Sequence, residues 1–238
     1  MDAGLQLRGI VAGYGQGDIL RGLDLDVPAG QVTCLIGPNG SGKSTVLRVI
    51  SGLLAPRSGQ VRLAGENVTG WAPRAMLTKG VAHVPQERSL FPAMSVWDNV
   101  LMGAYLSNDR DAVARRAAAI AERFPIVARR RHELAGSLSG GEQKTVEIAR
   151  TMMLDPPVLC FDEPSSGLEP RARRAVFGIL AELCRDGRTI LLVEQNARSG
   201  LAIAHNGAVL DAGVVRLVDS ATDLLDSPEV GRLYLGAS

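Results

Sequence analysis

The segment Gly37-Pro-Asn-Gly-Ser-Gly-Lys-Ser-Thr45 constrains the fold of this chain more than any other stretch. It has the pattern G-x-x-x-x-G-K-[ST], in which glycines let the backbone curl so that successive N–H groups face one anion. The apolar run 31–36 before it predicts a buried strand, and residues 46–50 after it predict a helix. At such a strand-to-helix turn the helix N-terminus adds favourable partial charge. The sequence therefore predicts a phosphate-binding loop, against the alternative of a glycine-rich turn that binds nothing.

Two side chains of this loop carry specific chemistry. We expect Lys43 to reach the β- and γ-phosphates of a nucleotide and the Ser44 hydroxyl to bind Mg²⁺. The residues expected to contact the nucleotide are Gly37, Pro38, Asn39, Gly40, Ser41, Gly42, Lys43, Ser44 and Thr45.

Composition narrows the function further. The 238 residues, 46% of them apolar, suffice for one large α/β domain or two small ones. The 26 Lys and Arg residues nearly balance the 25 Asp and Glu residues, and aromatic residues make up only 4%, so neither a basic field nor a base-stacking platform favours nucleic acid. The apolar runs are too short for a membrane span, and the first residues do not open a signal peptide. Three cysteines without metal-ligand spacing predict reduced, inert thiols.

Residues 4–27 predict two short β-strands around a glycine-rich turn, in which Tyr14 stands between two glycines. By itself Tyr14 would be an incidental loop aromatic. Because a phosphate loop follows, we expect its ring to stack on the adenine of a bound nucleotide.

The central part of the chain has a helical pattern. Apolar residues repeat at spacings of four, three and four over 113–124, which predicts one apolar helix face. The arginine clusters at 115–116 and 129–131 lie off this stripe and predict a solvated surface. We therefore expect a helical subdomain at about 89–153, inserted into an α/β core.

A second glycine-rich segment, Leu138-Ser-Gly-Gly-Glu142, follows. Ser139 and Glu142 have the spacing of a capping box, which predicts a helix from Ser139 to about Leu154. Glycine in a first turn costs about 1 kcal/mol relative to alanine, and a purely structural helix start has no need of two. The segment therefore predicts a second phosphate contact, made by bare N–H groups and a serine hydroxyl.

An apolar strand at 158–161 runs directly into Asp162 and Glu163. Two carboxylates at a buried strand end are costly unless they are used. We expect Asp162 to orient Mg²⁺ through its shell and Glu163 to polarise an attacking water. Further along, the sequence predicts a core strand at 189–193, a hairpin at 206–218, and short helices after Ser220 and after Ser227.

Over its whole length the chain resembles the ATP-binding-cassette (ABC) ATPase family. A phosphate loop occurs in many proteins, but 138–142 followed closely by 158–163 is highly specific to this family. The resemblance implies ATP and Mg²⁺ as cofactors. It also implies an α/β fold, with a phosphate-loop NTPase core, an antiparallel β subdomain and an inserted α-helical subdomain. We expect a single nucleotide-binding domain at 1–238, with its core at 1–88 and 154–238 and the helical subdomain at 89–153.

The resemblance assigns further roles. Gln86 corresponds to a glutamine that touches Mg²⁺ and the attacking water, on a loop leading to the membrane subunit. The signature that caps the γ-phosphate of ATP held by the opposite subunit corresponds to Leu138, Ser139, Gly140, Gly141 and Glu142. The loop that crosses the dimer interface corresponds to Ser165, Ser166, Gly167, Leu168 and Glu169, although the family usually has Asp at the last position.

The chain departs from the family after its last core strand. The family normally places a γ-phosphate-binding histidine after the strand-end glutamate, whereas here Glu194 is followed by Gln195 and Asn196. We expect Gln195 to contact the γ-phosphate in place of that histidine. The Val193–Asn196 run, with segments 85–92 and 234–236, resembles the second ATPase subunit of branched-chain amino-acid importers and their urea and amide relatives.

This resemblance implies a subunit at the cytoplasmic face of the cell membrane that hydrolyses ATP to energise import of branched-chain amino acids or a similar small polar solute. The implied partners are a second ATPase subunit (a paralogue or a second copy) in a head-to-tail dimer, permease subunits, and indirectly a periplasmic or surface solute-binding protein, with no nucleic acid. The alternatives are a lipid or drug exporter, a soluble cassette ATPase of DNA repair or translation, and another phosphate-loop enzyme such as a small-molecule kinase.

Four apolar residues after Gln86 bear on the permease contact: Leu90, Phe91, Met94 and Val96. They either pack the helical subdomain or form an exposed patch, which a soluble monomer has little reason to keep. Our hypothesis is that part of this patch receives a cytoplasmic helix of the permease.

Overall fold

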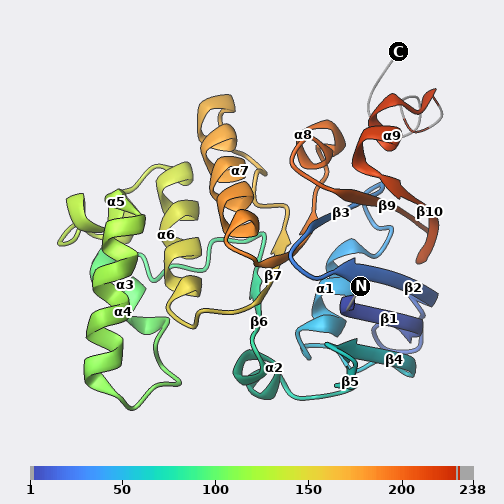
Figure 1. Cartoon of the computed structure of the whole chain (residues 1–238), viewed down its shortest axis with the longest axis horizontal. Coiled ribbons are helices and arrows are strands. Elements are labelled where there is room, and N and C mark those ends of the chain that lie inside the picture. Colours follow the sequence, from blue (N-terminus) through green and yellow to red (C-terminus); the bar gives the residue numbers. More distant parts are fainter. Residues whose placement is uncertain (1–2, 229, 231–238) are drawn as a thin grey trace. The chain divides into compact units, whose positions relative to one another are not determined.

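The computed structural model describes residues 3–228 and 230 (Figure 1). The chain divides into two units. The first, here called the core unit, comprises Met1–His83, Pro157–Glu163 and Ile179–Ser238. The second, the helical unit, comprises Val84–Pro156 and Pro164–Gly178.

A six-stranded sheet organises the core unit. Its centre consists of three parallel strands that are buried along their whole length, β3 (Val32–Ile36), β8 (Thr189–Val193) and β7 (Val158–Asp162). Because both faces of these strands are covered, their sequences are mostly apolar rather than alternating. The order of the six strands in the sheet is β10-β9-β3-β8-β7-β6. The remaining three strands are β6 (Val81–Val84), β9 (Asn206–Asp211) and β10 (Val214–Ser220).

A four-stranded sheet forms the rest of the β-structure of this unit. The order is β2-β1-β4-β5, and every neighbouring pair is antiparallel. In β2, Leu23, Leu25 and Val27 are buried while Asp24 and Asp26 are exposed, as a period of two requires. The strands are β1 (Ala3–Ala12), β2 (Leu20–Pro28), β4 (Ser58–Leu63) and β5 (Glu66–Asn67).

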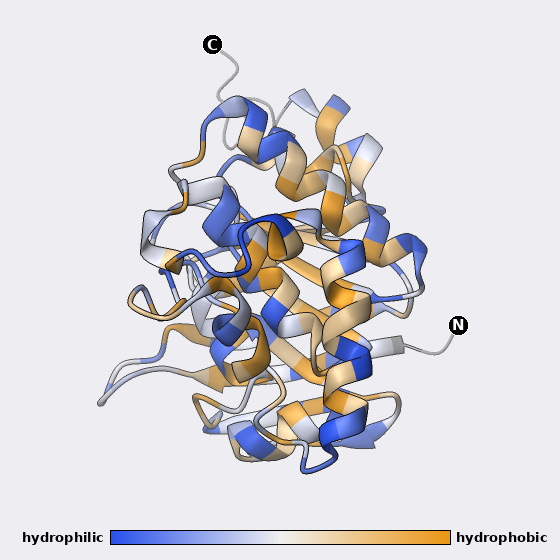
Figure 2. Ribbon diagram, turned by 90° about the vertical axis from the view of Figure 1, so that its left-hand side faces the viewer, coloured by the Kyte–Doolittle hydropathy of each residue, from blue (hydrophilic) through white to orange (hydrophobic). Residues whose placement is uncertain are grey.

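Helix α1 (Lys43–Ile50) packs between the two sheets (Figure 1). Its apolar side chains belong to one buried cluster with side chains of both sheets. Figure 2 shows that the interior strands are largely hydrophobic, whereas the helices carry both hydrophobic and hydrophilic residues. The other helices that lie entirely within the core unit are α2 (Pro73–Lys79), α8 (Ala197–Leu201) and α9 (Ala221–Asp226).

The helical unit contains the predicted amphipathic stretch. Ala117, Ile120 and Phe124 are buried, and Val113 at the end of the stripe is partly exposed. Its helices are α3 (Val96–Met102), α4 (Arg110–Arg123), α5 (Pro125–Arg129), a 3₁₀ turn η1 (Ala135–Ser137), α6 (Gly140–Met152) and the part of α7 (Pro170–Arg185) up to Gly178.

The predicted α/β class is confirmed. Strand β8 has the predicted bounds, the predicted hairpin is β9–β10, and the predicted helix after Ser220 is α9. The helix predicted after Ser139 ends at Met152, two residues before the predicted end. The helix predicted after Ser227 begins as expected, since Pro228 and Val230 are helical and the Ser227 hydroxyl accepts the Val230 N–H at 3.3 Å. The segment 234–236 lies outside the described residues.

The three cysteines are buried and unpaired with one another. Burial raises the pKa of the Cys160 thiol to about 12, and it also raises the pKa of Cys34 and of Cys184. Thiols of this kind remain protonated and unreactive at neutral pH, as predicted.

Among residues 3–228 and 230, no helix is both long enough and apolar enough to cross a bilayer.

Candidate functional site

The phosphate loop lies where predicted, between β3 and α1. The Lys43 side chain folds over the loop, and its Nζ donates hydrogen bonds to the carbonyl oxygens of Gly37 (2.8 Å) and Pro38 (3.0 Å). Burial lowers the pKa of this ammonium, while the charges of Glu163 and Asp162 oppose that shift. The one lysine of the loop is therefore held at its centre, where phosphates would gather.

Gly42 shows why the loop needs glycine. It is the N-cap of α1 and has φ = 109°, a conformation that side chains rarely adopt. A Cβ at this position would lie 2.8 Å from Cδ2 of Leu20. Both the backbone conformation and the packing against the apolar core therefore require glycine at this position.

Two carboxylates face this loop. The strands β3, β8 and β7 are parallel, so their carboxyl ends share one edge of the sheet, where ligands bind in folds of this kind. Asp162 ends β7, and its Oδ1 accepts a hydrogen bond of 3.1 Å from the Ser44 hydroxyl. The structure thus brings Lys43, Ser44, Asp162 and Glu163 together, as the sequence predicted.

The environment of Glu163 is unusual for a carboxylate. The residue is 8% exposed, and its backbone has φ = 43°, in the left-handed region. A non-glycine residue held there costs about 1–3 kcal/mol, and such strain concentrates at functional sites. Burial raises the pKa of the carboxyl group, Asp162 adds to the shift, and Lys43 opposes it. Both features are typical of functional sites, and a carboxyl group with a raised pKa suits a general base.

The oxygens of Ser44 and Asp162 suit Mg²⁺, which prefers hard oxygen ligands. Within the described part of the chain, no cluster of three or more His, Cys, Asp or Glu side chains could hold a metal ion without help. A magnesium ion at this position therefore fits the residues present if nucleotide and water oxygens complete its shell.

Gln195 follows β8 at the same sheet edge and is exposed. The next residue has a structural explanation: Asn196 caps α8, its side chain accepting a hydrogen bond of 3.1 Å from the Ser199 N–H. Asn196 is therefore explained by its position at the start of α8, whereas Gln195, which directly follows Glu194, is not a helix cap.

Tyr14 lies in the turn between β1 and β2 with 47% of its surface exposed. Its hydroxyl accepts a hydrogen bond of 2.9 Å from Nη1 of Arg48, and the Arg48 guanidinium carbon lies 5.7 Å from the ring centre. Arg48 was not predicted from the sequence, because no spacing links an exposed arginine of α1 to this turn. The ring is thus held at its hydroxyl end by Arg48, while nearly half of the residue stays exposed.

The signature segment begins α6 in the helical unit. The capping box is confirmed: the Ser139 hydroxyl accepts from the Glu142 N–H, and the Glu142 carboxylate accepts from the Ser139 N–H at 2.9 Å. The bonds from Ser139 lower the pKa of Glu142.

One of the two glycines has a structural reason, contrary to the prediction from the sequence. A Cβ on Gly141 would lie 2.6 Å from Cβ of Ala172 in α7, so this position must stay small for packing. At Gly140 the nearest atom is Cδ2 of Leu168 at 3.4 Å, an ordinary contact. Only Gly140 therefore still supports the ligand argument.

The remaining motif residues also belong to the helical unit. Residues 165–169 form a tight turn in which the Leu168 N–H donates to the Ser165 carbonyl, and Ser166, Gly167 and Glu169 are exposed. Gln86 lies in the exposed loop that follows β6.

The four apolar residues after Gln86 do not form one exposed patch. Val96 is completely buried, and Leu90 and Met94 are partly buried, so packing accounts for most of them. Phe91 is 47% exposed, while its backbone N–H and carbonyl both bond to the buried side chain of Asn99. The structure leaves Phe91 as the candidate contact residue.

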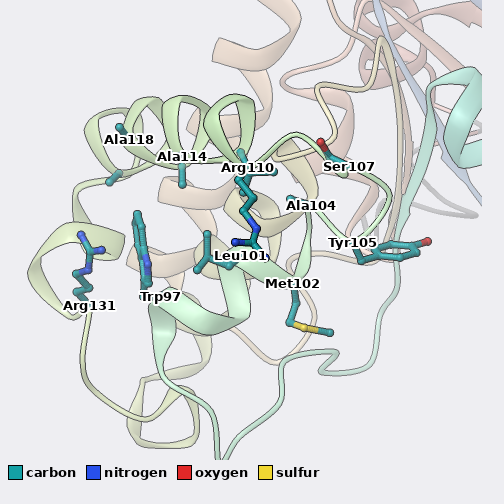
Figure 3. Close-up of a pocket in the computed structure, with 13 residues that line it drawn as sticks. Trp97, Leu101, Met102, Ala104, Tyr105, Ser107, Arg110, Ala114, Ala118 and Arg131 are labelled. Atoms are coloured by element: carbon teal, nitrogen blue, oxygen red, sulfur yellow. The ribbon is translucent and has the colours of Figure 1, made fainter.

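A groove of about 850 Å³ lies between α3 and α4 in the same unit. Trp97 and Leu101 of α3 face Ala114 and Ala118 of α4 across it (Figure 3). The Arg131 side chain lies beside Trp97 at one end of the groove, with its guanidinium carbon 3.6 Å from the ring centre. None of the motif residues lines this groove.

Comparison with known proteins places this geometry in a family. The family model described as "ABC transporter" matches residues 20–166. The high-affinity branched-chain amino acid transport ATP-binding protein BraG of Pseudomonas aeruginosa is 37% identical over 94% of this chain and 95% of its own. The chain belongs to the ABC transporter family.

Other relatives of this ABC ATPase have different names. The Nod factor export ATP-binding protein I of Cupriavidus metallidurans is 36% identical over 97% of this chain and 75% of its own. A crystal structure of an ATP-binding cassette of an ABC transporter in its ADP conformation is 29% identical, covers 99% of each chain and superposes with a TM-score of 0.88. The predicted phosphate-loop fold is confirmed, and the protein is the ATP-binding and ATP-hydrolysing subunit of an ABC transporter.

For this ATPase we predict that Tyr14→Ala raises the KM for ATP about fivefold or more, because base–aromatic stacking contributes about 1–3 kcal/mol. Tyr14→Phe is the matched control, since it keeps the ring and loses only the bond from Arg48. Steady-state ATPase kinetics measure both variants. An unchanged KM in Tyr14→Ala would mean that adenine stacks elsewhere.

Proposed function

We propose that this ATPase energises import of branched-chain amino acids or a similar small polar solute from the cytoplasmic face of the cell membrane. The observation that carries the hydrolytic part is the cluster of Lys43, Ser44, Asp162 and Glu163 at one sheet edge. Import is supported by the similarity to BraG and by the Val193–Asn196 run.

In the proposed reaction, Lys43 leaves its two loop carbonyls to bind the β- and γ-phosphates, a charge-assisted contact about twice as strong as a neutral one. Ser44 and Asp162 hold Mg²⁺, which neutralises charge on the phosphates when it is bound. Glu163 accepts the proton of the water that attacks the γ-phosphorus. The bond to the β-phosphate oxygen then breaks and yields ADP and phosphate.

Two glutamines complete the proposed site. Gln86 would orient the attacking water and contact Mg²⁺, and Gln195 would donate a hydrogen bond to the γ-phosphate. Both side chains are exposed and therefore accessible to a ligand in the free protein.

The proposed partners follow from the helical unit. Residues 138–142 would cap ATP held by a second ATPase subunit in a head-to-tail dimer, and the exposed turn 165–169 would cross that interface. A permease and, through it, a periplasmic or surface solute-binding protein complete the assembly. The N-terminus of α6 supports this arrangement, because Gly140 is partly exposed there and a helix N-terminus favours a phosphate.

Permease docking gives a direct test of the transport function. We predict that Phe91→Asp lowers uptake of labelled leucine at least about tenfold in cells that depend on this chain. Docking of the permease would bury the new carboxylate without a partner, which costs several kcal/mol. ATPase activity of the isolated variant should stay within about twofold, since surface substitutions are nearly neutral. Leu217→Asp, at an apolar residue of β10 that is 40% exposed, is the matched control.

Retained uptake in Phe91→Asp would place the docking surface elsewhere. An alternative result is that removal of the chain leaves uptake of leucine, urea and amides unchanged and stops export of a lipid or drug. That result would contradict the proposed import function. An export function is the second candidate because the Nod factor export relative is 36% identical.

Gln195 provides a test of how the two sites of a dimer divide the work. The histidine usual in this family can carry positive charge near neutral pH, whereas the amide of Gln195 is always neutral. Replacing a charged donor by a neutral one gives up about 1–2 kcal/mol, or roughly five- to thirtyfold in rate. We therefore expect Gln195→His to hydrolyse ATP faster, measured on the isolated protein between about pH 6 and 8.

A faster Gln195→His variant would support pairing with a paralogue whose own site keeps the histidine. A slower variant would show that Gln195 is a working part of this site, and the argument for an asymmetric pair would lose its physical basis.

A further inference from the structure

One face of α6 carries three charged residues at a spacing of three: Lys144, Glu147 and Arg150. Lys144 is 7% exposed and Glu147 only 1%, and Arg150 is partly buried. Burying such charges is costly unless each is paired and hydrogen-bonded. The proposed chemistry uses none of them, so their contacts need another explanation.

All three residues bind the segment that follows β6. The Glu147 carboxylate accepts the Ser89 N–H at 2.6 Å with one oxygen and lies 2.6 Å from the Lys144 ammonium with the other. Arg150 donates to the Ser89 carbonyl at 2.8 Å and to the Ser89 hydroxyl at 2.6 Å. Lys144 also donates to the Pro85 carbonyl at 3.2 Å.

These contacts hold the two ends of one short loop. Ser89 is bound through its N–H, its carbonyl and its hydroxyl, and Pro85 through its carbonyl. The residues between them, 86–88, are exposed. Fixing both ends of so short a segment removes most of its backbone freedom.

We propose that Lys144, Glu147 and Arg150 are positioning residues that fix the Gln86 loop to α6, the helix that starts at the signature segment. The loop and the signature helix then move as one body, and an ATP captured at Ser139 and Gly140 sets the position of Gln86 through a rigid connection. All of these residues belong to the helical unit. The inference rests on the proposed role of Gln86, and its first test does not.

The first test measures the order of the loop directly. Arg88 is exposed and lies between the two fixed ends, so trypsin cleaves after Arg88 only when the loop opens locally. In Arg150→Lys a single ammonium replaces the guanidinium fork, and in Glu147→Gln the amide NH₂ faces the Lys144 ammonium. We expect both variants to be cut after Arg88 about tenfold faster than the wild type, and Arg150→Lys, which keeps the positive charge, to retain its Tm. Mass spectrometry identifies the cut.

The matched control is Glu182→Gln. It makes the same substitution in an exposed i,i+3 ion pair with Arg185 on α7. This control should leave the cleavage rate unchanged. If Glu147→Gln does not fold, Arg150→Lys and Ser89→Ala carry the test, the latter removing only the hydroxyl that Arg150 binds. Unchanged cleavage in the folded variants would overturn the proposal.

The second test measures catalysis. We expect Arg150→Lys to lower kcat about fivefold with the KM for ATP within about twofold, and to have no further effect in a Gln86→Ala background. Additive losses would show a general structural defect and overturn the positioning function. An unchanged kcat in Gln86→Ala alone, with faster cleavage in Arg150→Lys, would reject the role of Gln86 while keeping the loop attachment.

Discussion

Glu163→Gln should bind ATP and hydrolyse it about 100- to 10,000-fold more slowly than the wild type, the range that general-base catalysis contributes. The amide keeps the shape of the buried side chain and the strained backbone at φ = 43°, but it cannot take the proton from water. Phosphate release at saturating ATP, together with an ATP-binding assay, measures both parts of the result. The other residues of the site remain in place, so the loss should fall on kcat.

The same variant should also reveal the partner. If the signature segment completes the site of a second subunit, unhydrolysed ATP holds two chains together, and size-exclusion chromatography should show a dimer that forms only with ATP. The double variant Glu163→Gln with Lys43→Ala is the control and should remain monomeric. A strictly monomeric Glu163→Gln protein with tightly bound ATP would contradict the shared site.

Lys43→Ala is the second change with a large expected effect. It removes the one cation held inside the phosphate loop, and a hydrogen bond to a charged group contributes about 1.5–3 kcal/mol. We expect ATP affinity to fall about tenfold or more and ATPase activity to fall at least about 100-fold, because the same contact strengthens as charge develops on the γ-phosphate.

The fold should survive this substitution, because the bonds that Lys43 donates go to carbonyls of its own loop. Circular dichroism and the Tm measure this. Lys79→Ala is the control for removal of a lysine from an exposed ion pair with Glu66. Unchanged turnover in Lys43→Ala would reject the assignment of the loop.

What the sequence predicted correctly rests on local rules. A strand buried on both faces must be continuously apolar, so 189–193 was identified to the residue. A capping box is a contact between residues three apart, so Ser139 and Glu142 could be paired without knowledge of the fold. An apolar strand was also expected to run directly into Asp162, and β7 ends at that residue.

What the sequence did not predict depends on contacts between distant segments. Arg48 reaches Tyr14 across 34 residues, and Arg150 reaches Ser89 across 61. The packing of Gly141 against Ala172 of α7 was not predicted, because the two residues are distant along the chain. The division of the helical subdomain from the core, and the roles of the site residues, stay predictions.

The three buried cysteines make this ATPase convenient for site-directed labelling. Because burial raises the pKa of Cys34, Cys160 and Cys184, their thiols stay protonated where maleimide and nitroxide reagents react with exposed thiolates. A single cysteine introduced at an exposed position should therefore be modified selectively in the natural sequence background. Distances between probes on two subunits could then be followed through the ATP cycle without first replacing any core residue.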